Sequence, residues 1–198
     1  MNHWVFVLLL VLLSACSVPL KSDLPVEQTY RLAPSVATAS QRLAVNLYVP
    51  KVMVSPALDS ERIVLIKSPL QQDFIAQSRW PDDLSVYLHA VILDALARSD
   101  GFQAVSEQML GQEGNYKLLL RVADFQAEYP KDAKDDAAVE VVMDASLVRV
   151  TDQHLLGQHR YAVRKDAVPV STGKIVEALN QALGEVIAAL VADLQKDL

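Results

Sequence analysis

The chain has 198 residues, a formal net charge of −6 and 52% hydrophobic residues. The acidic balance gives no reason to expect nucleic-acid binding, which needs a basic surface, and it disfavours broad electrostatic adhesion to anionic lipids. A single cysteine, Cys16, excludes a disulfide within the chain.

The chain begins with a short apolar run, Val5–Leu13, which leads into Ser14, Ala15 and Cys16. The run is too short to span a membrane, which takes about 20 apolar residues. Small residues after such a run are typical of a cleavage site. The pattern therefore predicts a signal peptide over residues 1–15. The alternative is an ordinary secretory signal followed by a cysteine that is there by chance.

The tetrad Leu13-Ser14-Ala15-Cys16 resembles the lipobox of bacterial lipoproteins. This resemblance implies cleavage before Cys16, a covalent diacylglycerol on its thiol and an N-acyl lipid on its amino group, with no other cofactor. It also implies a destination, because an Asp after the cysteine retains such lipoproteins at the inner membrane. Ser17 stands there instead, so we expect the outer membrane, with the acyl chains holding the protein at its periplasmic face.

The segment after the cysteine, residues 16–29, contains Pro19 and Pro25 and has no apolar period. We interpret it as a lipidated tether. Residues 30–198 have the size of a single periplasmic domain with one core. A short first strand is expected over Tyr30–Ala33.

Alternating apolar and polar residues predict a half-buried strand over Arg42–Val49. Pro50 ends this strand, and a loop runs on through Pro56. Further strands are predicted over Glu61–Lys67, which is rich in β-branched residues, and over Asp73–Ala76.

A helix is predicted from Pro81 onward, with Asp82 and Asp83 at its positive amino-terminal end and Gly101 just after its last turn. Its apolar residues recur at helical spacing. They are Leu84, Tyr87, Leu88, Val91, Ile92, Ala95 and Leu96.

Phe102–Ser106 reads as a strand, and a loop is expected over residues 108–114. Three long extended segments follow, joined by a charged turn at 130–136 and a tight turn at 151–153, and they predict an antiparallel meander. These segments are Tyr116–Tyr129, Val139–Val150 and His154–Arg164.

A last helix, with Ser171 or Thr172 as its cap, carries a continuous apolar stripe from Ile175 to Leu194. The stripe is predicted to cover the sheet, and part of it could contact a lipid or a second copy in a homo-oligomer. Gly184 inside the stripe costs about 1 kcal/mol relative to Ala, which a close approach of backbone to the sheet would explain. The elements together predict an α/β fold, a two-layer sandwich of a mixed, mostly antiparallel sheet with two main helices packed on one face.

No residue pattern predicts an enzyme. The 6 glycines are scattered and form no phosphate-binding loop. We interpret His89, His154 and His159 as surface or turn residues, and we expect no metal site. The acidic pairs Asp82/Asp83 and Asp135/Asp136 are explained by a helix start and a solvated turn.

Two stretches in the first half of the chain carry a further resemblance. One is Leu58-Asp59-x-x-x-Ile63-Val64, and the other is Arg79-Trp80 ahead of the helix. With the lipobox and the long last helix, they resemble the ABC-type transport auxiliary lipoprotein family, which includes the PqiC-like proteins. Where that family has Leu-Asp-Arg-Pro, this chain has Ser60 and Glu61 in the last two positions.

The resemblance implies a non-enzymatic accessory lipoprotein that works with MCE-domain proteins and inner-membrane transporter components, moving lipid across the periplasm and supporting envelope integrity. Arg79, Trp80 and Asp59 are the residues that we consider for a partner contact, since Arg and Trp are frequent interface anchors. The alternative for Trp80 is that it fastens the helix start to the core. The alternative function is a stand-alone lipid-binding carrier with a cavity in the sandwich.

Overall fold

The computed structural model describes residues 26–109, 115–129 and 136–198. Its frame is a meander of three long antiparallel strands, β7 (Asn115–Glu128), β8 (Ala137–Arg149) and β9 (His154–Val168). All three strands were predicted, because apolar residues recur at every second position on the face that becomes buried. The predicted turns at 108–114 and 130–136 lie largely outside the described residues.

Three short strands pair one after another, in parallel, with the free edge of β7. They are β2 (Leu43–Tyr48), β3 (Met53–Val54) and β4 (Arg62–Ser68). The sequence predicts β2 and β4, whereas it predicts a loop where β3 lies. The sheet extends beyond β2 through β6 (Phe102–Ser106), and beyond β4 through β5 (Gln71–Arg79) and β1 (Gln28–Thr29). The predicted mixed sheet is confirmed, and it is open rather than closed into a barrel.

β5 is longer than predicted because a bulge interrupts its alternation. Val64 of β4 faces Phe74, but Arg62, only two residues away, faces Arg79. The extra residues of β5 lie between Phe74 and Arg79. Within them, Gln77 has a positive φ of 57°, and Ser78 Oγ donates to the carbonyl of Ile75 at 2.8 Å. Such a bulge bends a strand and breaks its period of two.

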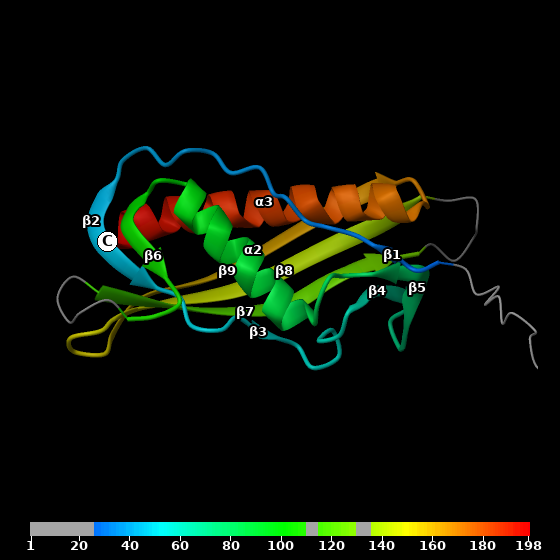
Figure 1. Cartoon of the computed structure of the whole chain (residues 1–198), viewed down its shortest axis with the longest axis horizontal. Helices are drawn as coiled ribbons and strands as arrows, with labels where there is room; N and C mark the ends of the chain where they lie inside the picture. The colour runs from blue at the N-terminus through cyan, green and yellow to red at the C-terminus, as the bar shows by residue number, and fades with distance from the viewer. Residues whose placement is uncertain (1–25, 110–114, 130–135) are drawn as a thin grey trace, which may run out of the picture.

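Two helices, α2 (Leu84–Arg98) and α3 (Thr172–Asp197), pack against the same face of the sheet (Figure 1). This confirms the predicted two-layer arrangement. Every residue of the predicted α3 stripe is buried against the rest of the domain. By length and composition alone, α3 could cross a membrane. However, 61% of its most apolar 18-residue stretch is buried inside the domain, as in a core helix.

Residues 30–42, which we call the strap, cross over α3 and run beside α2 on the way from β1 to β2 (Figure 1). The predicted strand Tyr30–Ala33 is wrong, because the strand β1 lies just before it and the segment after Tyr30 bonds to helix side chains. Ala33 exchanges two hydrogen bonds with the amide of Asn180, at 2.7 and 3.3 Å. Leu32 N donates to the hydroxyl of Tyr87.

The strap also explains Gly184. A Cβ at this position would lie 3.1 Å from the carbonyl oxygen of Ser35. A close backbone approach was predicted, but the segment that approaches is the strap and not the sheet.

Candidate functional site

Cys16 and Ser17 lie outside the described residues, so the structure bears on them only through the point where the folded domain begins. Gln28 and Thr29 pair in parallel with Ser78 and Arg79 at the end of β5. Tyr30 N extends this pairing by donating to Arg79 O at 2.9 Å. The segment that follows the lipobox therefore joins the domain at the outer edge of β5.

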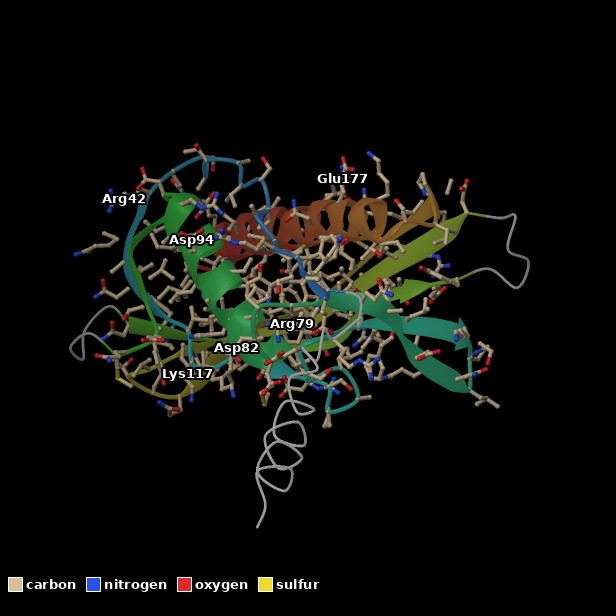
Figure 2. All side chains as sticks on the ribbon, turned by 45° about the vertical axis from the view of Figure 1, so that its right-hand side comes forward. Arg42, Arg79, Asp82, Asp94, Lys117 and Glu177 are labelled. Carbon is tan, nitrogen blue, oxygen red and sulfur yellow. The ribbon has the colours of Figure 1, made fainter. Side chains whose placement is uncertain are left out.

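Arg79 fastens this junction (Figure 2). Its guanidinium lies 3.0 Å from Glu61 and 3.8 Å from Glu27, and its Nε donates to the hydroxyl of Thr29 at 3.3 Å. The side chain is 44% exposed. Arg79 thus joins β1, β5 and the segment before β4 through ion pairs within the chain, and part of its surface stays open to solvent.

Trp80 lies in the core, with 1% of its surface exposed. Its ring packs between Tyr87 of α2 and Phe125 of β7, with ring centroids 6.0 and 5.8 Å away. The backbone N–H of Trp80 donates to the carbonyl oxygen of Glu61 at 2.6 Å. The side chain fastens the start of α2 to the sheet and presents almost no surface that a partner could contact.

Asp59 supplies the carboxylate that the start of α2 needs. Its Oδ1 accepts from Ser85 N at 2.9 Å. The first amides of a helix have no partner within the helix, and a carboxylate there also faces the positive end of the helix dipole. Asp83 occupies the N-cap position but makes no side-chain capping bond. The sequence predicts that Asp82 and Asp83 stabilise the start of the helix. In the structure, the capping bond comes from Asp59, in a loop distant in the chain.

Asp59, Arg79 and Trp80 therefore meet at one place, where the segment before β4, the end of β5 and the start of α2 converge. Their contacts are capping, ion pairing and ring packing. What the arrangement can do is hold the tether-proximal end of the domain together.

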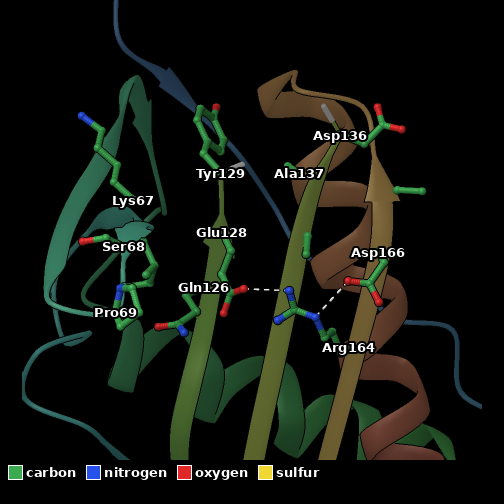
Figure 3. Close-up of a pocket in the computed structure, with 13 residues that line it drawn as sticks. Lys67, Ser68, Pro69, Gln126, Glu128, Tyr129, Asp136, Ala137, Arg164 and Asp166 are labelled. Atoms are coloured by element: carbon green, nitrogen blue, oxygen red, sulfur yellow. Dashed lines mark hydrogen bonds and ion pairs between the residues drawn. The ribbon is translucent and has the colours of Figure 1, made fainter. Parts of the chain in front are cut away.

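A groove of about 760 Å³ opens on the face of the sheet opposite to the helices (Figure 3). Ile66, Pro69 and Tyr129 give it an apolar wall, and Ala137 and Ala138 lie at the start of β8. Its polar wall is Arg164, which lies 2.7 Å from Glu128 and 2.9 Å from Asp166 (Figure 3).

Burial and charge both act on the acids and phenols around this groove. Burial raises the pKa of Tyr129. Burial also raises the pKa of Glu140, and the carboxylates of Glu128 and Asp124 raise it further. The two cations that line the groove are both paired, Lys67 with Asp73 and Arg164 with two carboxylates, so the groove suits an amphipathic or weakly cationic ligand better than an anion.

A second polar cluster joins β9 to the end of α3. His159 Nε2 lies 2.8 Å from Asp197, and its Nδ1 lies 3.7 Å from Asp193. The Tyr161 hydroxyl donates to Asp193 at 3.2 Å. Burial and the Asp193 carboxylate raise the pKa of Tyr161 well above its ordinary value. Sequence reasoning missed this cluster, because nothing in the sequence says which face of β9 meets α3.

His89 also makes a polar contact, with its Nε2 3.4 Å from Glu107, and the backbone N–H of His154 donates to Asp152 at 3.1 Å. Among the described residues, no group of three or more His, Cys, Asp or Glu side chains is placed to hold a metal ion. The acidic residues Asp82 and Asp83 stand at the start of α2, as expected.

Comparison with known proteins gives one family and a set of solved structures. A family model described as "ABC-type transport auxiliary lipoprotein component" matches residues 30–191. No curated protein matches the chain. The match begins at the strap and ends in α3, so it covers nearly the whole folded domain.

Two crystal structures share the fold. Protein XCC0632 from Xanthomonas campestris superposes with a TM-score of 0.76 at 21% identity, over 86% of this chain and 95% of that one. The crystal structure of an uncharacterized protein superposes with a TM-score of 0.63 at 18% identity, over 81% and 99%. Lipoprotein GNA1162 from Neisseria meningitidis is a looser match, with a TM-score of 0.39 at 14% identity over 77% and 99%.

Proposed function

The chain belongs to the ABC-type transport auxiliary lipoprotein component family, and from this premise we propose a specific role. We propose that it is an outer-membrane-anchored periplasmic lipoprotein, an accessory of an MCE/ABC-type system that moves lipid between the membranes and supports envelope integrity. The observation that carries the proposal is the combination of a lipobox at residues 13–16 with a family match over residues 30–191. The family itself is one of transport auxiliaries, which agrees with a non-enzymatic role.

The geometry supports an anchored accessory. The tether enters at β1, on the outer edge of β5, and the Arg79 ion pairs with Glu27 and Glu61 fix that entry point. The opposite end of the long meander, at the turn between β8 and β9, then extends away from the anchor. In this proposal that far end is the part of the domain nearest to components arriving from the inner membrane.

The test is recovery of partners from the cell envelope. An epitope tag after Leu198 leaves the tether untouched, and the tagged protein is cross-linked and purified from envelopes. We expect an MCE-domain protein and inner-membrane transporter components to copurify. Absence of any MCE protein, in a strain that expresses one, contradicts the proposal.

The second candidate is a stand-alone periplasmic lipid carrier, and the groove of about 760 Å³ is the observation that favours it. The carrier hypothesis expected a cavity between the layers, whereas this groove lies on the outer face of the sheet. Between the layers, the space is taken by large side chains, among them Trp80, Phe125 and Met143. Native mass spectrometry of the chain from Leu20 onward separates the two functions. A stoichiometric phospholipid favours the carrier, and a ligand-free chain favours the accessory.

A further inference from the structure

The tip of the β4–β5 hairpin is the most exposed apolar point among the described residues. Ser68 pairs with Gln71, so Pro69 and Leu70 form the turn between them. Leu70 is 99% exposed. One exposed leucine is ordinary on a protein surface, so the exposure of Leu70 alone does not indicate a binding site. Its position in the fold is what distinguishes it.

That position is on the side from which the tether arrives. β5 runs away from the tip, and β1 lies parallel to it with Gln28 opposite Ser78. The chain before Gln28 therefore lies on the tip side of this pair, where Val26 is 86% exposed. Cys16 precedes Val26 by ten residues (26 − 16 = 10), which span at most about 35 Å when extended. A tether of this length lets an anchor at Cys16 hold a bilayer within reach of the hairpin tip.

The charges on the hairpin do not oppose contact with a lipid surface. Residues 68–72 contain no charged side chain. Below them, Lys67 and Asp73 form an ion pair with each other, and the guanidinium of Arg62 lies over the ring of Phe74, 4.0 Å from its centroid. The tip is therefore locally neutral on a chain whose net charge is −6, and it does not repel anionic headgroups.

We propose that Pro69 and Leu70 contact the headgroup region of the bilayer that holds the lipid anchor, and that this second contact fixes how the domain stands on the membrane. The inference rests on the proposed anchoring through Cys16. Once the anchor is inserted, contact by the hairpin is an intramolecular event at high effective concentration, so one apolar side chain is enough to bias the orientation.

The far end of the sheet provides a matched control position. Leu155, at the start of β9, is 50% exposed and pairs with Val148, close to the end of the ladder that holds Tyr116 and Arg149. β4 meets β7 at the other end, at Ala127 and Glu128. At about 3.3 Å per residue these ends are roughly 40 Å apart, so Leu155 should stay in water when Leu70 touches lipid.

The experiment uses two single-cysteine labels in the full mature lipoprotein. Cys16 is the only natural cysteine, and acylation removes its thiol, so Leu70→Cys and Leu155→Cys each introduce one reactive thiol. Each is labelled with an environment-sensitive fluorophore. The protein is reconstituted into vesicles of phosphatidylethanolamine and phosphatidylglycerol, with or without a headgroup-level nitroxide quencher. Flotation with the vesicles shows whether the acyl anchor is inserted, and the fluorescence of the label shows whether the hairpin contacts lipid.

We expect the label at position 70 to shift its emission to the blue in vesicles and to be quenched several-fold more strongly than the label at 155. If the protein floats with the vesicles while the two labels are quenched equally, the hairpin contact is refuted and the anchoring stands. Failure to float refutes both. A label at 70 that is already shielded without vesicles shows a protein contact instead, which also refutes the inference.

Discussion

The carboxylate of Asp59 and the amide of Ser85 come from segments 26 residues apart and meet at 2.9 Å. Removing such a cap costs about 1 kcal/mol. We expect Asp59→Ala to lower the free energy of unfolding by that amount in urea denaturation. Asp59→Asn keeps an acceptor oxygen and should lose less.

Asp83 provides the matched control for this prediction. It occupies the N-cap position of the same helix but makes no side-chain capping bond. Asp83→Ala should therefore cost clearly less than Asp59→Ala. If the two substitutions were equally costly, the capping role assigned to Asp59 would be wrong.

Asp193, near the end of α3, makes the stability of the domain sensitive to acid. The hydrogen bond from Lys196 is the main cause that holds the pKa of Asp193 below its ordinary value of 3.8, and the hydrogen bond from Tyr161 adds to it. A pKa that is lower in the folded state means that ionised Asp193 stabilises the fold above about pH 4, and that this stabilisation is lost as the pH falls through the folded-state pKa.

Thermal denaturation of the wild type and of Asp193→Asn tests this dependence. The wild type should have the higher Tm near neutral pH, and the difference should shrink as the pH falls below 4. A difference in Tm that stays constant from pH 7 to pH 3 would show that the charge of Asp193 contributes nothing.

Single residues were the hardest part to predict from the sequence. Burial of the Leu84 to Leu96 stripe follows from its spacing, but the bonds of Asp59 and His159 depend on which loop or helix comes close in space. His159 and Asp197 are 38 residues apart in the chain. Pairings of this kind are fixed by the packing of α3 on β9 and leave no local signal.

Among the elements, those with a clean period were predicted best. Phe102–Ser106 was predicted with the bounds that β6 has, and the helical spacing identified both α2 and α3. Two elements were missed or misplaced because they have only two residues, β1 and β3. β5 was predicted too short, since the bulge at Gln77 hides its alternation. Very short strands owe their existence to a neighbouring strand rather than to their own pattern.

Gly184 connects two elements, α3 and the strap, and its replacement measures how tightly they pack. Gly184→Ala gains up to about 1 kcal/mol of helix propensity, but its Cβ would lie 3.1 Å from Ser35 O. We therefore expect little net change for Ala. For Gly184→Val we expect a lower Tm and faster hydrogen exchange at the Ala33 amide, which bonds to Asn180.

Gly173, near the start of the same helix, is the control. A Cβ at Gly173 would meet nothing within 4 Å, so Gly173→Ala should raise the Tm. If Gly184→Ala raised the Tm as much as Gly173→Ala does, the strap would not press on α3.

For the molecule as a whole, the order of the strands in the sheet could not be predicted from the sequence. The meander of β7, β8 and β9 follows from short turns between long strands. The alignment of β2, β3 and β4 along one edge of β7 does not, because each of these parallel pairings joins segments far apart in the chain. That alignment places β5 and β1, and with them the start of the described chain at Val26, at one end of the sheet. The proposed orientation on the membrane therefore depends on the strand topology.

Cys16→Ser separates the anchor from the fold. The core and the hydrogen bonds described above all lie within residues 26–198, so we expect an unchanged circular dichroism spectrum and Tm for the exported chain. Fractionation should move the protein from the membrane to the soluble periplasm, and the envelope defect of a deletion strain should persist. Full restoration of envelope integrity by the soluble variant would contradict the proposed role of the anchor.

Ser17 tests the destination separately from the anchor. In the lipoproteins that the lipobox resembles, Asp after the cysteine retains the protein at the inner membrane, so Ser17→Asp should keep the acyl chains and change the membrane. Density-gradient separation of the two membranes should find the wild type and Ser17→Ala in the outer membrane and Ser17→Asp in the inner membrane. An accessory that must stand at the outer membrane should then fail to restore envelope integrity in its Ser17→Asp form, although it is lipidated and folded. If Ser17→Asp restored it fully from the inner membrane, the transport role would survive, but the outer-membrane location would not be part of it.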